Sequence, residues 1–193
     1  MEKSENKMTT LSEQAMNVIL KEHLALYNHF NFQELQAIVD PINKADAIFL
    51  IGMGRSGLMM EAAAMRLMHL GYKAYVVGQV TAPAIKMGDL LITGSGSGTT
   101  ATVVRAAEKA LEIGADVISF TTNGKSKLAG ISTYLVTIPA AQKEQHENAI
   151  SDQYAGSLFE QGLLLLFDAL IQTLWKIDGS SAEKLYKRHS NLE

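Results

Sequence analysis

Residues 90–103 read Leu-Leu-Ile-Thr-Gly-Ser-Gly-Ser-Gly-Thr-Thr-Ala-Thr-Val. An apolar run leads into alternating glycines and hydroxyl residues, and a helical pattern begins near Thr99, so we interpret the segment as a strand, a loop and a helix start. Glycines let the backbone approach a bound group closely, beside the free amides of the helix start. Because the loop has no charged side chain, it predicts a site where neutral donors and the helix dipole bind a phosphate ester. Its hydroxyl ligands would be Ser95, Ser97, Thr99 and Thr100.

Short apolar runs alternate with helical patterns on both sides of this loop. Strands are predicted at 47–51, 74–77, 90–93, 116–121 and 134–138, with helices near 56–70, 82–87, 99–113 and 125–130. Such alternation is typical of a parallel sheet covered by helices on both faces. We therefore predict a three-layer α/β/α fold with a five-stranded parallel sheet. In such sheets ligands bind at the carboxyl ends of the strands.

The ends of the chain are predicted to add helices to this core. Two N-terminal helices are expected, the second capped by Asn31 and ending or bending near Pro41. Residues 158–175 are apolar around most of a helix, which therefore needs cover on several sides, in part from another subunit. We expect one domain, divided into N-terminal helices (1–45), sheet core (46–140), a long loop (141–156) and C-terminal helices (157–193).

The composition limits the classes of function. A chain of 193 residues suits one domain with its own core, and the absence of cysteine excludes disulfides, thiolate nucleophiles and cysteine metal ligands. A net charge of -3 gives no broad positive field for nucleic acid or anionic membranes. We find no signal-peptide core and no apolar stretch near the roughly 18 residues of a membrane span. The expectation is a cytoplasmic protein without a nucleic-acid or membrane partner.

The loop after the first predicted strand, residues 52–57, reads Gly-Met-Gly-Arg-Ser-Gly, which matches the Gly-x-Gly-x-x-Gly pattern of dinucleotide sites. That pattern also needs an acidic residue about 20 positions further on, and residues 75–79 contain no carboxylate. We therefore favour a second loop of the same chemical kind, facing the same ligand, in which Gly54, Arg55 and Ser56 take part. Arg55 would donate charge-assisted hydrogen bonds to a phosphate or to sugar oxygens. A solvated surface arginine is the alternative.

Several segments together resemble a known family. They are Gly-Arg-Ser-Gly at 54–57, Ala-Met-Arg-Leu-Met-His-Leu-Gly at 64–71 and Ser-Gly-Ser-Gly-Thr-Thr at 95–100. These resemble the SIS (sugar isomerase) phosphosugar-binding family. Residues 156–161 and 188–193 extend the resemblance and narrow it to the 6-phospho-3-hexuloisomerases within that family.

The resemblance implies a flavodoxin-like sheet, a homo-oligomer (a tetramer or a dimer) and no metal or other cofactor. It implies conversion of 3-hexulose 6-phosphate to fructose 6-phosphate in the ribulose monophosphate pathway of formaldehyde fixation, in functional pairing with hexulose-6-phosphate synthase. Two alternatives stay open. One is another phosphosugar isomerase, acting on a pentose or heptose phosphate, and the other is a non-catalytic SIS module that senses a sugar phosphate.

Moving a ketone from C3 to C2 requires a base that removes the proton on C2 and returns a proton to C3 through an enediolate. Glu160 is our candidate base, because its helix neighbours carry no positive charge and burial should favour its protonated form. A buried glutamate with a structural hydrogen bond is the alternative, and Asp168 is a lower-ranked competitor. The resemblance also points to His189, which could shuttle protons in a neighbouring subunit's site or belong to a solvated tail.

Overall fold

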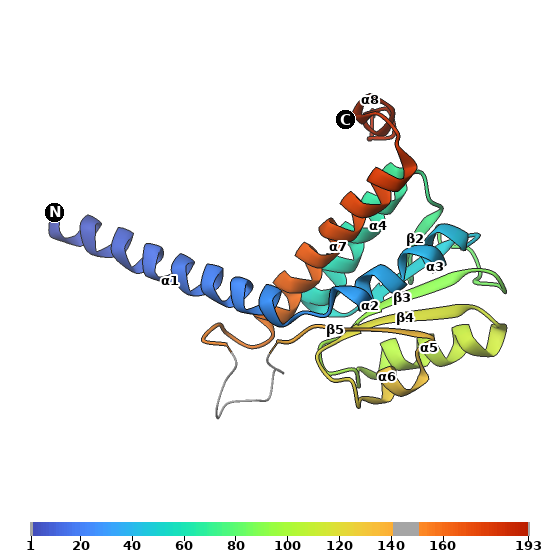
Figure 1. The fold of residues 1–193 in the computed structure, drawn as a ribbon, viewed down its shortest axis with the longest axis horizontal. Helices are drawn as coiled ribbons and strands as arrows, with labels where there is room; N and C mark the ends of the chain where they lie inside the picture. Colours follow the sequence, from blue (N-terminus) through green and yellow to red (C-terminus); the bar gives the residue numbers. More distant parts are fainter. Residues whose placement is uncertain (1, 141–150, 193) are drawn as a thin grey trace.

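The computed structural model describes residues 2–140 and 151–192. Its elements are α1 (Glu2–His29), α2 (Phe32–Ala37), α3 (Val39–Lys44), β1 (Ile48–Gly52), α4 (Gly54–Leu70), β2 (Ala74–Val76), β3 (Leu90–Gly94), α5 (Ala101–Ile113), β4 (Asp116–Thr121), α6 (Lys127–Ile131), β5 (Tyr134–Thr137), α7 (Ser157–Asp178) and α8 (Ala182–Tyr186). Figure 1 shows the sheet between α5 and α6 on one face and α2, α3, α4 and α7 on the other. Most of the predicted loop at 141–156 lies outside the described residues.

The sheet has the strand order β2-β1-β3-β4-β5, and every neighbouring pair is parallel. Side chains alternate between its two faces, as the period of a strand requires. Ile48 and Leu50 of β1 pack with α4 and α7. Phe49 and Ile51 of the same strand pack with α5. The predicted fold class is confirmed, and all five predicted strands are present to within one residue at each end.

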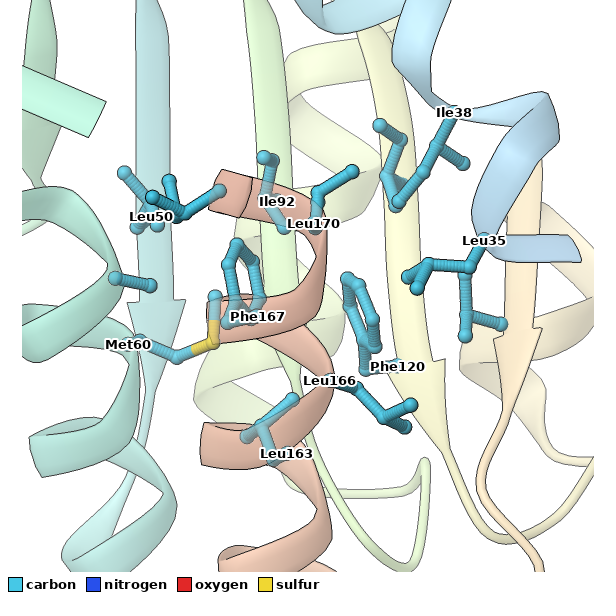
Figure 2. Packing of buried hydrophobic residues seen from close by; sticks show 14 of the residues in the cluster. Leu35, Ile38, Leu50, Met60, Ile92, Phe120, Leu163, Leu166, Phe167 and Leu170 are labelled. Atoms are coloured by element: carbon cyan, nitrogen blue, oxygen red, sulfur yellow. The ribbon is translucent and has the colours of Figure 1, made fainter. Parts of the chain in front are cut away.

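Helix α7 forms the centre of the larger core. Leu163, Phe167 and Leu170 point from α7 toward the sheet, where the ring of Phe167 lies 4.9 Å from that of Phe120 (Figure 2). Met60 of α4 packs against the same cluster. The prediction of cover on several sides is confirmed, because α4, α1 and the sheet all contact this helix, while the part expected from another subunit stays a prediction.

The apolar character of α7 corrects one sequence expectation. Over its 22 residues, α7 is long and apolar enough to cross a membrane by length and composition. The expectation that no stretch approaches this limit was therefore wrong. Slightly more than half of the apolar window, 56%, is buried inside the protein, which is the pattern of a core helix in a folded domain.

Two prolines account for two further differences. The second N-terminal helix breaks at Ile38 rather than near Pro41, so that α2 ends at Ala37 and α3 begins at Val39. Proline at 41 has no N–H for the carbonyl of Ala37, four residues earlier, and its ring crowds that carbonyl. Residues 82–87 were predicted to be helical and form no helix, because Pro83 disfavours the helical conformation of the residue before it.

Helix α1 has an exposed apolar stripe. Its C-terminal end contributes Leu26 to the core next to α7, but the rest extends away from the body of the protein (Figure 1). The stripe residues follow a helical spacing, and each is between 54% and 62% exposed. They are Met16, Leu20, Leu24 and Tyr27. Within the described part of the chain, no other element covers this stripe.

Candidate active site

The two glycine-rich loops leave the sheet side by side. Strands β1 and β3 are parallel neighbours, and their last residues, Gly52 and Gly94, are register partners. Residues 53–57 and 95–100 therefore start from adjacent points on the carboxyl edge of the sheet. The prediction that both loops lie at this edge is confirmed.

The loop after β3 gathers hydroxyl groups around the start of α5. The side-chain oxygens of Ser95 and Thr100 are 3.0 Å apart and share a hydrogen bond. Ser97 Oγ accepts hydrogen bonds from the amide of Thr99 at 3.3 Å and from Thr99 Oγ1 at 3.1 Å. Thr100 precedes α5 without capping it through its side chain, so the amides of the first helical turn remain available to an acceptor.

The loop after β1 passes directly into α4. A Cβ on Gly57 would lie 2.9 Å from the carbonyl oxygen of Gly52, so the backbone of α4 touches the backbone of the strand. The close approach of the two backbones accounts for Gly52 and Gly57 of the Gly-x-Gly-x-x-Gly pattern, so a bound dinucleotide is not needed to explain them. In the first turn Ser56 is buried, whereas the Arg55 side chain is 49% exposed.

Arg55 connects the start of α4 to the start of α7. Its Nη1 lies 3.3 Å from Glu160 Oε2 and donates to Ser157 Oγ, also at 3.3 Å. Ser157 Oγ in turn donates to the carbonyl of Tyr154 at 2.7 Å. The Glu160 side chain is buried, with 6% exposure. The sequence expectation considered only the neighbours of Glu160 on its own helix, none of which is cationic, and it missed Arg55, which approaches Glu160 from α4.

The first turns of α7 also pack against the loop after β3. A Cβ on Gly96 would lie 3.2 Å from the ring of Phe159, and a Cβ on Gly94 would lie 3.0 Å from Leu163. Because neither glycine has a side chain, α7 can pack closely against the end of β3 and the loop that follows it. As a result, the helix turn that carries Glu160 lies beside the predicted anion site.

The segment that leads into α7 is held by Glu22 of α1. The Glu22 carboxylate accepts hydrogen bonds from Ser151 Oγ at 2.7 Å, from the amide of Asp152 at 2.6 Å and from Gln153 Nε2 at 2.8 Å. Partial burial alone would raise the pKa of Glu22, but the hydrogen bonds from these three residues lower that pKa below its ordinary value. The chain entering α7 is thus fixed to a helix more than 120 residues earlier.

Sequence reasoning missed this contribution of α1. Glu22 interrupts the apolar spacing of the first N-terminal helix, and that interruption is the signal in the sequence that could have pointed to this role. The neighbouring His23 forms a 3.0 Å hydrogen bond with Gln161, next to the candidate base. A Cβ on Gly162 would lie 2.8 Å from Leu26, so α1 and α7 cross in close contact.

His189 lies at the other end of the protein from Glu160. Its ring stacks on that of His69 with centroids 3.8 Å apart, and both rings line a cavity of about 280 Å³ together with Asp168. Burial, with the nearby charges of His189 and Arg66, lowers the pKa of His69. His69 is 15 residues from the start of α4, about 22 Å along the helix. One chain therefore does not bring His189 or Asp168 to the Arg55–Glu160 pair.

The loops after β1 and β3 and the first turn of α7 together supply hydrogen-bond donors and a carboxylate. Hydroxyls, backbone amides and a guanidinium are all suited to an anionic or polyhydroxyl ligand. Across residues 2–140 and 151–192, no group of three or more histidine, aspartate or glutamate side chains could hold a metal ion. The arrangement can bind an anion and present a carboxylate beside it.

A protein-family model decides the classification. The model described as the SIS domain matches residues 41–163, which include both glycine-rich loops and Glu160. The chain belongs to the SIS domain family. The sequence resemblance stated above is thereby confirmed at the level of this family.

This SIS domain is similar to curated proteins named 3-hexulose-6-phosphate isomerase. The protein of Mycobacterium gastri is 49% identical over 161 residues, which cover 83% of this chain and 81% of the relative. The protein of Bacillus subtilis is 39% identical over 162 residues, covering 83% and 88%.

A solved structure extends the similarity to three dimensions. It is that of a Methanococcus jannaschii protein for which a function of 3-hexulose-6-phosphate isomerase is inferred. That protein is 30% identical, with a TM-score of 0.80, over 93% of this chain and 99% of its own.

Proposed function

We propose that this chain is a 3-hexulose-6-phosphate isomerase, which converts 3-hexulose 6-phosphate into fructose 6-phosphate. The observation that carries the proposal is the buried carboxylate of Glu160 beside a loop of neutral anion donors, at one edge of the sheet. The names of the relatives support the choice of substrate. A phosphosugar isomerase needs both parts, one to hold the phosphate and one to move a proton.

The phosphate end of the sugar binds the loop after β3 in this proposal. The amides and hydroxyls of residues 95–100 donate to its oxygens, and the positive end of the α5 dipole favours its charge. From the neighbouring loop, we assign Ser56, the backbone at Gly54 and the exposed guanidinium of Arg55 to the sugar oxygens. No charge in the loop after β3 is needed to neutralise the phosphate.

Glu160 carries out the proton transfers. Its carboxylate removes the proton from C2, the electron pair of that bond forms the C2–C3 double bond, and the C3 carbonyl oxygen takes up the negative charge. The enediolate then accepts the same proton at C3, while the proton on the C2 hydroxyl moves to the C3 oxygen. Arg55, 3.3 Å from Glu160, is placed to stabilise negative charge on the enediolate oxygens.

His189 stays a prediction. It could shuttle the hydroxyl proton only if an assembly brings the α8 end of one copy to the Glu160 end of another, since the rings of His69 and His189 stack far from Glu160 within one chain. An imidazole suits this task because it both donates and accepts protons near neutral pH.

A coupled assay tests the proposed reaction. With ribulose 5-phosphate, formaldehyde and a hexulose-6-phosphate synthase, we expect the chain to produce fructose 6-phosphate. A reaction without the synthase is the control and should give no product. If the synthase consumes formaldehyde and no fructose 6-phosphate appears, the proposed substrate is wrong. Turnover of a pentose or heptose phosphate instead would favour a related isomerase, and binding without any turnover would favour a sugar-phosphate sensor.

We also propose that the chain forms a homo-oligomer, a dimer or a tetramer, and acts in the cytoplasm alongside the synthase. The apolar stripe of α1 supports self-association, since its four residues are each more than half exposed. The packed helices α4 and α7 carry further exposed apolar side chains, namely Leu58, Met65 and Leu165. Because these side chains and the stripe are all apolar, copies of one chain can cover both.

Sedimentation velocity measures the oligomeric state. We expect the natural chain to sediment as a dimer or larger at micromolar concentration, and Leu20→Lys with Leu24→Lys to shift it toward the monomer. Val80→Lys is the matched control, because Val80 is fully exposed outside the stripe and should leave the assembly unchanged. A natural chain that sediments as a monomer contradicts the proposal.

A further inference from the structure

Residues at the end of β4 donate three hydrogen bonds to a single carbonyl group in the loop after β3. The carbonyl oxygen of Gly96 accepts hydrogen bonds from Thr121 Oγ1 at 3.0 Å, from Thr122 Oγ1 at 2.8 Å and from the amide of Thr122 at 3.0 Å. A carbonyl oxygen commonly accepts one or two such bonds. Three donors from two consecutive residues therefore fix the orientation of this peptide group.

Fixing that carbonyl also fixes the amide that follows it. In a trans peptide the C=O and the next N–H point in opposite directions, and the described chain contains no cis peptide bond. Because the oxygen of Gly96 is turned toward β4, the N–H of Ser97 is turned away from it. Within residues 2–140 and 151–192, the Ser97 N–H donates to no acceptor. It is a spare donor at the predicted phosphate site.

The next carbonyl of the loop is held in the same way. The oxygen of Gly98 accepts a 3.0 Å hydrogen bond from the amide of Leu128 in α6. The amide of Thr99 is thereby turned away from α6, and it donates to Ser97 Oγ at 3.3 Å. Carbonyls that point back and amides that point outward create a concave anion site.

We infer that Thr121 and Thr122 are positioning residues, which aim the Ser97 amide at the phosphate group of the substrate by holding the Gly96 carbonyl. This inference rests on the proposed function, because it assigns the phosphate to the loop after β3. Neither threonine contacts the substrate. Thr121 is fully buried, and its oxygen also accepts a 3.2 Å hydrogen bond from the amide of Asn123, whereas the side chain of Thr122 serves the Gly96 carbonyl.

Thr122 gives the sharper test, because its hydroxyl can be removed with little change of shape. Thr122→Val is expected to weaken the binding of inorganic phosphate, measured by calorimetry, by roughly two- to tenfold, the range for one hydrogen bond. In the isomerase assay, KM should rise by the same factor with kcat unchanged, because the lost interaction is distant from C2 and C3. Thr122→Ser retains the hydroxyl and should restore both values.

Thr173→Val is the matched control. Thr173 Oγ1 donates to the carbonyl of Ala169 at 2.9 Å within α7, so this variant also loses one hydroxyl–carbonyl bond, away from the loop. It should bind phosphate as the natural chain does. The inference is overturned if Thr122→Val binds phosphate normally, if Thr122→Ser behaves like Thr122→Val, or if the variant lowers only the melting temperature. Failure of the proposed reaction is recognised separately, because the phosphate titration needs no turnover.

Discussion

Replacing Glu160 with Gln is expected to lower isomerase turnover by at least about 10²–10⁴-fold, the usual contribution of a general base. The amide has the shape of the carboxyl group and can still accept a hydrogen bond from Arg55, but it cannot take a proton from carbon. Binding of fructose 6-phosphate should remain within a few-fold of that of the natural chain. Steady-state assays and calorimetry on the same preparation measure the two effects.

Asp168→Asn provides the comparison for this variant. Asp168 is an exposed carboxylate on the same helix, eight residues further on, beside the His69–His189 end of the protein. Its loss removes the same charge from α7 and should leave turnover close to that of the natural chain. If Glu160→Gln retains turnover, or if Asp168→Asn abolishes it, Glu160 is not the base. Exchange of the C2 proton with deuterated solvent should be lost in Glu160→Gln alone.

Gly98→Ala is expected to weaken phosphate binding by at least about tenfold. Gly98 has a φ of +65°, which an alanine adopts only with strain, and the added Cβ would lie 2.1 Å from Ser126 Oγ and 2.5 Å from Ser126 Cβ. Ser126 cannot easily turn aside, because it caps α6 by accepting a hydrogen bond from Ala129 at 3.2 Å. The loop must therefore move, and its amides with it. Calorimetry with inorganic phosphate measures the loss.

Gly130→Ala is the neutral counterpart. Gly130 lies in α6, has no positive φ, and an added Cβ would meet no atom within 4 Å, so binding should be unchanged and stability equal or higher. Ser126→Gly in the Gly98→Ala background removes the atoms that clash and should restore part of the affinity. Normal phosphate binding by a folded Gly98→Ala would mean that this loop does not hold the phosphate.

The fold was largely predictable because its signals are local. Each strand is a short apolar run bounded by polar or glycine residues, and the cap of Asn31 on α2 is confirmed by its 3.1 Å bond from the amide of Gln33. The errors occurred where one residue overrides a pattern. Pro41 breaks a helix at Ile38, three residues before itself, and Pro83 prevents the short helix predicted between β2 and β3.

The candidate site was predictable only in part. The hydroxyl loop and the candidate base, Glu160, were proposed from patterns on single segments, which the sequence displays directly. The pairing of Arg55 with Glu160 joins residues 105 positions apart, and no helical or strand period relates them. The hydrogen bonds between Glu22 and the segment before α7 are equally non-local, since Glu22 and Ser151 are 129 residues apart. Contacts of this kind depend on how elements pack, so they appear only with the fold.

The paired ends of β1 and β3 determine where this chain can gain or lose residues over evolution. One residue inserted into either strand would displace its loop by about 3.3 Å and exchange the two faces of that strand. The irregular crossover at 77–88 is under no such constraint, because it leaves from β2 at the edge of the sheet. Insertions and deletions should therefore accumulate in that crossover among descendants of this protein, while the two strands keep their lengths.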